Sequence, residues 1–387
     1  MDFDLSDDQR QIKDSVDRML AAAYADLKTK AAAQKEPHGF SKAIWAQYAE
    51  LGLLGIPFAE EHGGLGAGPT ETMLVMDAIG RNAAIEPYLS TVVMGGGVLR
   101  HAGSAAQKAA IIPEIIEGKR KLALAHQERH SRFDLADVST KAASDGAGGY
   151  TIDGDKMVVL GGDSADTLIV VARMSGGQRD HKGIGLFLVA GNAAGVKRTG
   201  YATQDGMRAA DISFKAVKVA AGDVIVGPSG DGLAVLERVV DEGIAALSAE
   251  AVGAMAALQE LTVDYVKTRK QFGVAIGSFQ VIQHKAVDMF TALEQARSMG
   301  YYATMMVSEP NAAERRKAMN AVKVQIGKSA RFVGENAVQL HGGIGMTMEY
   351  KAGHYFKRLT MIELAHGNTD HHLQALAKAG GLIAAAA

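Results

Sequence analysis

Histidine and carboxylate side chains gather near the C-terminal end of the sequence, at His366, Asp370, His371 and His372. Imidazole and carboxylate groups are common metal ligands, so this cluster could hold a metal ion. No second group of ligands with a recognisable spacing accompanies it, and the sequence therefore favours the absence of a metal site. Asp370 has a further interpretation, as a carboxylate that stabilises a helix start.

Other short motifs fail on their spacing or context. The Gly-Lys-Ser stretch 327–329 resembles the end of a phosphate loop, but Val322 stands where the first glycine of that loop belongs. His126 and His130 have a metal-like separation, yet they flank Glu128 at an expected strand–loop transition. The sequence contains no strand-linked G-x-G-x-x-G, no G-x-S-x-G elbow and no cysteine. Rossmann cofactor sites, disulfides, thiolate metal sites and cysteine nucleophiles are thereby disfavoured or excluded.

Composition limits the class of protein. The 387 residues are 48% hydrophobic and 22% charged, and 41 Lys and Arg balance 43 Asp and Glu. At about 150 residues per domain, two or three globular domains are expected, with no nucleic-acid partner and no anionic membrane partner. The acidic start MDFDLSDDQR does not resemble a signal peptide, and no uninterrupted apolar run approaches about 18 residues. We expect a soluble, cytoplasmic protein.

The elements that must position any site fall into three blocks. Helical periodicity extends over the first 120 residues, with a predicted capping box from Ser6 to Gln9. Short β-rich runs follow from about 122 to 226, and Asp153-Gly154 between two such runs predicts a type I′ hairpin. Long amphipathic segments return at about 231–270, 278–307 and 312–341, and a last helix follows Thr369.

This order predicts an α+β multidomain fold. The expected domains are an N-terminal α-helical domain (1–121), a middle antiparallel β-barrel or sandwich domain (122–227) and a C-terminal four-helix bundle (228–387).

Three motifs lie in order along this frame. The first covers 55–66 and contains Gly-Ile-Pro and Glu-His-Gly-Gly-Leu-Gly; the second covers 265–280 and contains Arg-Lys-Gln-Phe-Gly; the third covers 339–350 and contains Gln-Leu-His-Gly-Gly-Ile-Gly-Met-Thr. Together they resemble the motifs of the acyl-CoA dehydrogenase flavoprotein family. The resemblance is to a divergent member or to a member of the small-subunit type.

The resemblance implies FAD bound between subunits of a homo- or hetero-oligomer, either a dimer or a tetramer. It implies an acyl-CoA substrate, fatty acid metabolism and an electron-transferring flavoprotein as electron acceptor. In the family a carboxylate removes the α-proton of the thioester while the β-hydrogen passes as hydride to the flavin.

The resemblance also places cofactor-binding residues. Arg269, Phe272 and Gln280 correspond to contacts with the diphosphate and adenosine end of FAD, and Gln339, Gly342 and Gly343 to a neighbouring segment that cradles it. Gln127 and Thr369 stand at two further cofactor positions. Phe272 could instead only pack, the two glycines could only make a turn, and Arg269 could form a surface ion pair.

Other positions depart from the family pattern. The usual Thr-Glu-Pro is Gln127-Glu128-Arg129, and the aromatic and threonine that face the flavin ring are Val158 and Leu160. A stacking partner and a hydroxyl are lost there.

The catalytic carboxylate is also missing. The family's Glu-Gly-Thr stretch corresponds here to Gly367-Asn368-Thr369, and its second base position corresponds to Gly243, followed by Ile244 at a position that is often cationic. The nearest substitutes are Glu242, interpreted as a solvated carboxylate, Glu250, interpreted as a paired core carboxylate, and Asp370. Asp370 is the preferred replacement base.

Several functions remain open from the sequence. The chain could be an acyl-CoA dehydrogenase with a displaced base, or a non-catalytic partner subunit of a heteromeric acyl-CoA dehydrogenase. It could also be a same-fold flavin oxidase or monooxygenase, or a helical scaffold without cofactor.

Overall fold

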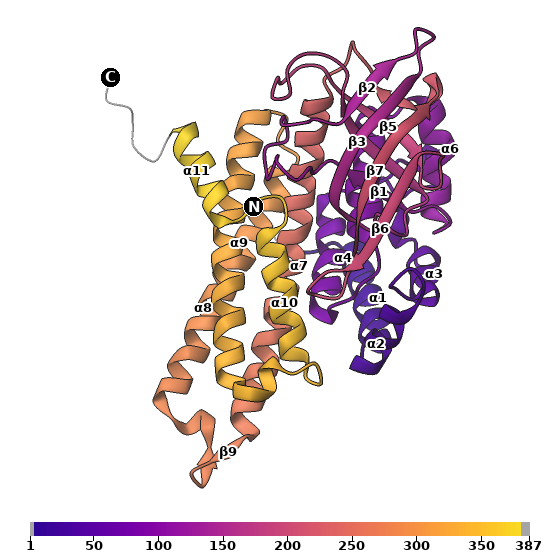
Figure 1. Ribbon diagram of the computed structural model, residues 1–387. Coiled ribbons are helices and arrows are strands. Elements are labelled where there is room, and N and C mark those ends of the chain that lie inside the picture. The colour runs from indigo at the N-terminus through magenta and orange to yellow at the C-terminus, as the bar shows by residue number, and fades with distance from the viewer. Residues whose placement is uncertain (1–3, 381–387) are drawn as a thin grey trace. The chain divides into compact units, whose positions relative to one another are not determined.

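The computed structural model describes residues 4–380, and Figure 1 shows their helices and strands. These residues form two compact units. The first, the bundle unit, consists of residues 4–32, Pro69–Ile85 and 244–380. The second, the sheet unit, consists of Ala33–Gly68 and Glu86–Gly243. The boundaries of the three predicted domains stay a prediction.

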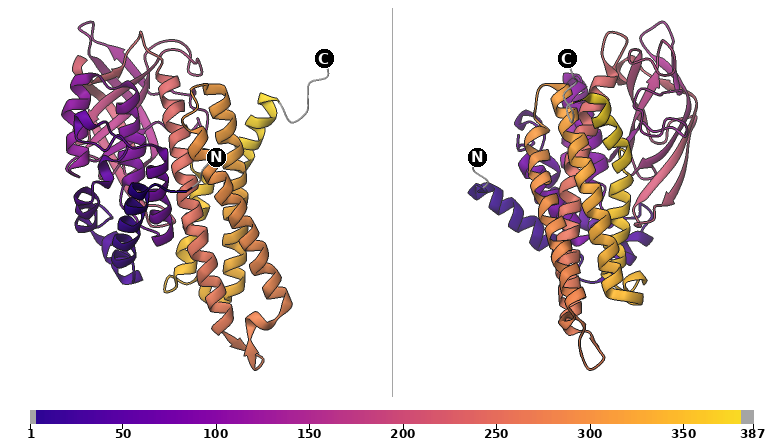
Figure 2. Two further views of the ribbon diagram at one scale, coloured as in Figure 1. Left: turned by 180° about the vertical axis from the view of Figure 1, so that it is seen from behind. Right: turned by 90° about the vertical axis from the view of Figure 1, so that its left-hand side faces the viewer.

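Long helices make up most of the bundle unit. They are α1 (Asp7–Ala23), α4 (Pro69–Asn82), the larger part of α7 (Gly232–Thr268), α8 (Gln280–Met306), α9 (Ala312–His341), α10 (Lys351–Leu364) and α11 (Thr369–Ala379). The small hairpin of β9 (Lys270–Gln271) and β10 (Val274–Ala275) connects α7 to α8. Helix α9 packs against α8, α10 and α11, and Figure 2 shows these long helices side by side. The unit is therefore built around α9.

Most of these helices agree with the sequence prediction. The predicted capping box is present at α1: the Ser6 hydroxyl accepts a hydrogen bond from the Gln9 backbone N–H at 3.2 Å, and the Gln9 side chain accepts one from the Ser6 N–H at 3.0 Å. Helix α10 has no counterpart among the predicted helices. Up to residue 380, where the described part of the chain ends, the C-terminal region accordingly contains five helices, α7 to α11, rather than four.

Close backbone contact and one buried ion pair hold α7 in place. A Cβ atom added at Gly80 of α4 would lie 1.9 Å from the Glu250 carbonyl oxygen, so only glycine permits this approach of α4 to α7. The Glu250 carboxylate accepts hydrogen bonds from Arg358 Nε at 2.5 Å and Nη2 at 2.7 Å. The side chains of Glu250 and Arg358 are 2% and 9% exposed, which confirms the prediction of a paired core carboxylate.

The sheet unit combines short helices with one large sheet. The helices are α3 (Lys42–Glu50), a π-helix (Leu89–Gly95), α5 (Gly96–Ala102) and α6 (Ala105–Ile116), and α2 (Leu27–Lys35) ends in this unit. The strands are β1 (Leu122–Ala125), β2 (Lys141–Ser144), β3 (Tyr150–Leu160), β4 (Thr167–Arg173), β5 (Ile184–Ala190), β6 (Val196–Ala202), β7 (Arg208–Val219) and β8 (Val224–Val226). Their order is β6-β7-β3-β2-β4-β5-β8, with β1 paired to β4. Most pairs are antiparallel, as predicted, and β1–β4 and β2–β4 are parallel.

The predicted hairpin at Asp153-Gly154 is wrong. Residues Tyr150–Leu160 form a single strand, β3, which pairs with β7 along its length. Gly154 has φ +148° beside a register shift, and an added Cβ would lie 2.7 Å from Thr140 Cα. The glycine therefore serves a bulge with a close neighbour, and the long pairing with β7 overrides the local turn preference.

Helix α7 has the length and hydropathy of a membrane span, although the sequence predicts no such segment. Most of its apolar window is buried inside the protein, and core helices of this kind pass the same test.

Loss of one partner of the buried ion pair should destabilise the bundle unit. Glu250→Leu leaves Arg358 buried without its carboxylate, so we expect the free energy of unfolding to fall by about 3–5 kcal/mol. The double variant Glu250→Leu, Arg358→Leu should recover a large part of that loss, because no charge remains buried. Denaturant unfolding measures both variants. Arg331→Ala, which removes an exposed ion pair with Glu335, is the control, and equal losses in control and single variant would contradict the prediction.

Candidate functional site

An aromatic cluster brings the second and third sequence motifs together at one end of the bundle unit. The ring of Tyr265, near the end of α7, lies 4.6 Å from that of His341 and 6.2 Å from that of Tyr350, measured between centroids. His341 and Tyr350 are 5.1 Å apart. Because His341 ends α9, this cluster brings the segment that carries Arg269 close to the segment that carries Gly342.

The predicted cofactor residues at this end face solvent. Arg269, Gln280 and Gln339 are exposed, and Phe272 is 92% exposed with φ +52°. Such exposure argues against the interpretation that Phe272 only packs within its own unit. Phe272 makes an edge-on contact with Phe279 at 6.3 Å, so the β9–β10 hairpin presents a pair of aromatic rings.

The two glycines of the third motif leave open space. Gly342 has φ +63° and ends α9, so it does make a turn. A Cβ added at Gly342 or Gly343 would meet no atom within 4 Å. The backbone here can be approached closely by a ligand, and the turn and the cofactor interpretation are compatible.

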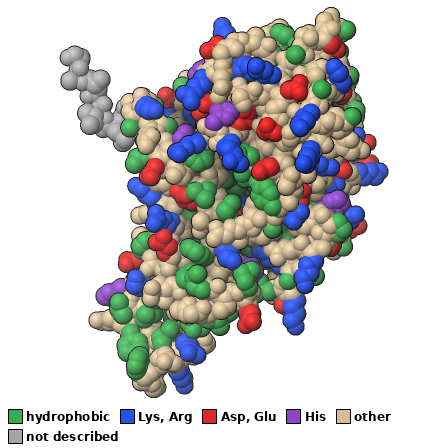
Figure 3. Space-filling model, in the orientation of Figure 1, with side chains coloured by type: hydrophobic (Ala, Val, Ile, Leu, Met, Phe, Trp, Pro, Cys, Tyr) green, Lys and Arg blue, Asp and Glu red, His purple; other side chains and the backbone are tan. Residues whose placement is uncertain are grey.

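Exposed hydrophobic side chains surround the same end, and Figure 3 shows such side chains gathered over the β9–β10 tip. The exposed large hydrophobic residues include Val274, Val281, Val287, Phe290, Ile344, Met346 and Met348. A concentration of exposed apolar side chains is typical of a surface that another molecule covers.

In the sheet unit, Glu128 of the Gln127-Glu128-Arg129 segment forms a buried ion pair. Lys156 Nζ lies 2.6 Å from Glu128 Oε1, and the carboxylate also accepts hydrogen bonds from Ser139 and Thr140. Burial alone would raise the pKa of Glu128, but the Lys156 charge and these hydrogen bonds together lower it to about 2. The pair lines a cavity of about 580 Å³ with Arg129 and Met157. Glu128 is therefore ionised and structural at neutral pH.

Val158, at the position of the ring-facing aromatic, sits on a bulge of β3. Its φ is +52°, a strained value for a β-branched residue, and the register shifts between Lys156 and Val159. The Val158 N–H donates to the Asp211 carboxylate at 3.1 Å, and the Tyr201 hydroxyl donates to the same oxygen at 2.8 Å. The bulge is held in place, but its exposed side chain offers no aromatic face to a flavin ring.

Two of the three substitute bases have structural roles. Glu250 is paired with Arg358, as described above. The Glu242 carboxylate lies 2.5 Å from Arg100, 2.7 Å from His101 and 3.4 Å from Arg238. Its side chain is only 11% exposed, so the interpretation of Glu242 as a solvated carboxylate is wrong. Burial raises the pKa of Glu242, but His101, Arg100 and Arg238 together lower it below its usual value, so this carboxylate is poorly suited to accept a proton.

Asp370 lies in the first turn of α11 and is exposed, with Asn368 as the N-cap residue. Its position at a helix start agrees with the sequence, and its role as base stays a prediction. Thr369 packs its hydroxyl close to Gly327 of α9, where an added Cβ would lie 2.3 Å from Oγ1, and its cofactor role also stays a prediction. Among the residues that the structure describes, no cluster of His, Cys, Asp or Glu is arranged for a metal ion.

His366 is a residue that the sequence interpretation missed as a possible base. A Cβ at Gly367 would lie 2.6 Å from His372 Nε2 and 2.7 Å from His371 Cδ2, so position 367 cannot carry a side chain. Matching Gly367 to the glycine of the family's Glu-Gly-Thr therefore places the glutamate at His366. The signal in the sequence was Gly367 itself. Aligning it with the glycine of the family motif shifts the alignment by one residue from the one used above.

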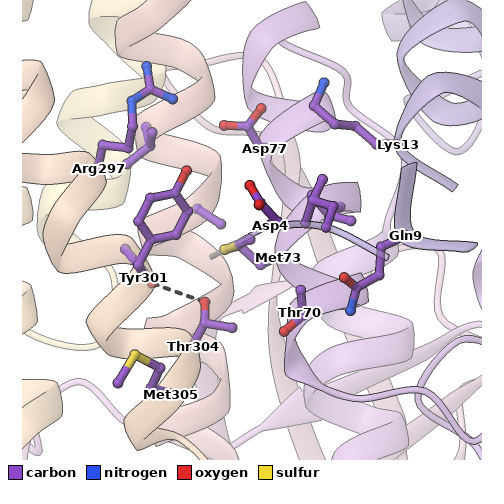
Figure 4. A pocket seen from close by; sticks show the side chains of 15 residues that line it. Asp4, Gln9, Lys13, Thr70, Met73, Asp77, Arg297, Tyr301, Thr304 and Met305 are labelled. Carbon is purple, nitrogen blue, oxygen red and sulfur yellow. Dashed lines mark hydrogen bonds between the residues drawn. The ribbon is translucent and has the colours of Figure 1, made fainter. Parts of the chain in front are cut away.

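A separate cavity of about 400 Å³ lies in the bundle unit among α1, α4, α7 and α8. Figure 4 shows Arg297 and Tyr301 on one side and Lys13 on the other, with Asp77 between them. Burial raises the pKa of Asp77, which the nearby arginines partly oppose. The lining residues that the structure describes include none of the predicted site residues.

Removal of the Glu128 charge should weaken the protein in a pH-dependent manner. Glu128→Gln leaves Lys156 buried without its partner, so we expect a loss of about 3–5 kcal/mol in unfolding free energy at neutral pH. Because the folded state lowers the pKa of Glu128 from 4.5 to about 2, its contribution is complete above about pH 4.5 and declines toward pH 2. The difference between wild type and variant should therefore narrow over that interval in denaturant unfolding. Glu117→Gln, at an exposed pair with Lys119, is the matched control, and a pH-independent difference would contradict the prediction.

Comparison with known sequences gives consistent relatives. The chain is 31% identical over 374 residues to an isovaleryl-CoA dehydrogenase, mitochondrial, of Oryza sativa subsp. japonica, covering 94% of this chain and 89% of the relative. It is 31% identical over 375 residues to a 2-methylacyl-CoA dehydrogenase, mitochondrial, of Solanum tuberosum, covering 95% and 89%.

Solved structures share the whole fold. A chain of the Tcur3481–Tcur3483 steroid ACAD superimposes with a TM-score of 0.86 at 26% identity, covering 96% of this chain and 97% of that one. A chain in a structure described as an electron-transferring flavoprotein of Acidaminococcus fermentans gives 0.89 at 25% identity and full coverage of both. The FAD complex of PigA gives 0.87 at 24% identity and 98% coverage of both, and shows the fold alone.

Family models match the chain in the order that the fold requires: the acyl-CoA dehydrogenase N-terminal domain over residues 6–119, the middle domain over 123–217 and the C-terminal domain over 230–381. With relatives of this identity along nearly its full length, the chain belongs to the acyl-CoA dehydrogenase family.

Proposed function

We propose that this chain is an FAD-dependent acyl-CoA dehydrogenase subunit that oxidises the α,β-bond of an acyl-CoA thioester and delivers the electrons to an electron-transferring flavoprotein. The observation that carries the proposal is the assembly of Arg269, Phe272, Gln339 and Gly342 at one exposed end of the bundle unit. The sequence expectations of a cytoplasmic location and of fatty acid metabolism belong to the same proposal.

The residues at this end fit the diphosphate and adenosine part of FAD. The guanidinium of Arg269 can neutralise a diphosphate, and the open backbone of Gly342 and Gly343 allows the close approach that a diphosphate needs. Phe272 presents an exposed ring on which an adenine can stack. Bound FAD supplies the acceptor for the β-hydrogen, and the chain's own residues supply binding, orientation and a base.

An oligomer follows from the same arrangement. The exposed hydrophobic side chains around the β9–β10 end need a cover, and a second subunit over the cofactor would provide it. A homodimer, or a dimer of dimers, is the form in which the proposed site is complete.

A second candidate function is a partner subunit in a mixed oligomer. The strained, non-aromatic Val158 and the glycine at position 243 favour it, because this chain then serves the diphosphate end of FAD while another chain supplies the ring-facing side and base. One similar structure, the Tcur3481–Tcur3483 steroid ACAD, has a name that joins two chains.

The absorption spectrum of the purified protein tests both functions. A yellow protein whose flavin loses colour without oxygen on addition of one acyl-CoA of a chain-length panel is the expected result. Rapid recovery of that colour with oxygen, rather than with an electron-transferring flavoprotein, would indicate an oxidase or monooxygenase instead. A protein without flavin that also fails to bind added FAD would contradict the proposal and support a scaffold role.

Arg269→Ala should weaken FAD binding strongly. A charge-assisted hydrogen bond contributes about 1.5–3 kcal/mol, so we expect the dissociation constant for FAD to rise by about 10- to 150-fold. Fluorescence titration of the apoprotein with FAD measures this change. Arg331→Ala, an exposed arginine of α9 outside the proposed site, should leave FAD binding unchanged, and equal affinities in the two variants would contradict the assignment.

A further inference from the structure

The turn between α10 and α11 holds a histidine in a strained backbone conformation. His366 has φ +55°, a region that histidine occupies rarely and at a free-energy cost of about 1–3 kcal/mol. Strain of this size persists only where surrounding contacts impose it, and such residues concentrate at functional sites. Of the five other described non-glycine residues with positive φ, Val158 and Phe272 lie at proposed cofactor positions, whereas Ala83, Arg132 and Ala216 do not.

Side chains from α9 impose the conformation of this turn. Lys323 donates hydrogen bonds to the carbonyl oxygens of Ile362 at 2.7 Å and Glu363 at 2.9 Å, at the end of α10. The buried ring of His372 lies 2.7 Å from Asn320 Oδ1 and 3.1 Å from the His366 carbonyl oxygen. The backbone of His366 is thus held from α9 and from α11, while its side chain is only partly buried.

The buried ring of His372 is neutral at physiological pH. Burial, reinforced by the charge of Lys323, lowers the pKa of His372 to about 3, so the ring carries one proton at neutral pH. The ring holds both neighbours from α11: Nε2 lies 3.1 Å from the His366 carbonyl oxygen and Nδ1 lies 2.7 Å from Asn320 Oδ1, and a neutral ring donates to one of these two acceptors. His372 cannot itself act as a base on substrate, because both of its ring nitrogens are engaged.

We propose that His366 is the general base of this chain, taking the α-proton of the acyl-CoA thioester in place of the glutamate of the family. The inference rests on the proposed function. In the step, the α-carbon–hydrogen bond breaks and a nitrogen–hydrogen bond forms on the His366 imidazole. With FAD bound, the flavin would be the oxidant that accepts the β-hydrogen with its electron pair, which would leave a carbon–carbon double bond.

The other candidate base in this turn is less well placed. Asp370 is exposed to solvent in the first turn of α11, whereas His366 is partly buried in the turn itself. The charged and titratable groups that α9, α10 and α11 bring to this turn include Arg316, Lys323, Arg331, Glu363, Asp370, His371 and His372.

Exchange of the α-proton tests His366 without requiring flavin reduction. The probe is a set of 3-thia-acyl-CoA thioesters of increasing chain length, in which sulfur replaces the β-carbon so that no hydride can leave. Incorporation of deuterium from D₂O at the α-carbon, measured by mass spectrometry on the FAD-loaded protein, reports proton removal alone. Wild type should exchange, and His366→Asn should exchange at least 100-fold more slowly.

The variants are chosen to keep the turn folded. Asparagine tolerates the left-handed conformation, so His366→Asn should retain the melting temperature and the FAD content of wild type. His366→Glu should restore exchange and move the acidic limb of its pH profile down by about 2 units, from the range of histidine to that of glutamate. His181→Gln, at an exposed histidine of the sheet unit, is the matched control and should exchange as wild type does.

The outcomes separate the two proposals. Wild type that bleaches with an acyl-CoA while His366→Asn exchanges normally would overturn the assignment of His366 and leave the proposed function standing. Loss of exchange in Asp370→Asn with normal exchange in His366→Asn would move the role to Asp370. Wild type that neither bleaches nor exchanges with any thioester would overturn both proposals.

Discussion

The buried ion pair between Glu250 and Arg358 is the constraint on which both functional ends of the bundle unit depend. It joins the middle of α7 to the middle of α10. Neither charge can move away without leaving the other unpaired in an apolar interior. Helix α7 leads to Arg269 and the β9–β10 hairpin, and α10 leads to His366. An ion pair of this kind adds little net stability compared with apolar packing, but it fixes which turn of one helix faces which turn of the other.

Helix α9 completes this frame from the other side. Its Asn320 and Lys323 are three residues apart and therefore lie on one face, where they hold the turn between α10 and α11. Its last residue, His341, stacks with Tyr265 at the opposite end of the helix. One helix thus positions the two sets of residues for which we propose a chemical role.

Local signals in the sequence were reliable where the physical cause was local. The capping box at Ser6 and the helical periodicity of α7, α8 and α9 are of this kind, and the structure confirms them. The pairing of Glu250 could be predicted because a carboxylate among alanine and valine must find a cation, although the sequence does not say which one. The hairpin prediction at Asp153-Gly154 failed because a local turn preference is weaker than pairing along β7, a strand of 12 residues.

The candidate site shows the same division. The motifs predict which glycines and which phenylalanine belong to the proposed cofactor end, and the structure shows that these residues are exposed. The role of Glu242 could not be predicted, because two of its three side-chain partners, Arg100 and His101, come from a helix far away in sequence. His366 was missed because its conformation depends on contacts of Gly367 with His371 and His372 that no spacing rule describes.

The length of α10 has a consequence for how two defective subunits could complement each other in an oligomer. Its 14 residues span about 20 Å, and they separate the turn of His366 from the end that carries Gly342 and Arg269. A chain with a substitution only at the His366 turn keeps an intact cofactor end. A chain with a substitution only at the cofactor end keeps an intact His366 turn. In an assembly where the cofactor end of one subunit lies at the base of its neighbour, a mixture of two such inactive chains would contain some complete sites. Complementation between inactive subunits is therefore possible because the length of α10 keeps the two ends apart.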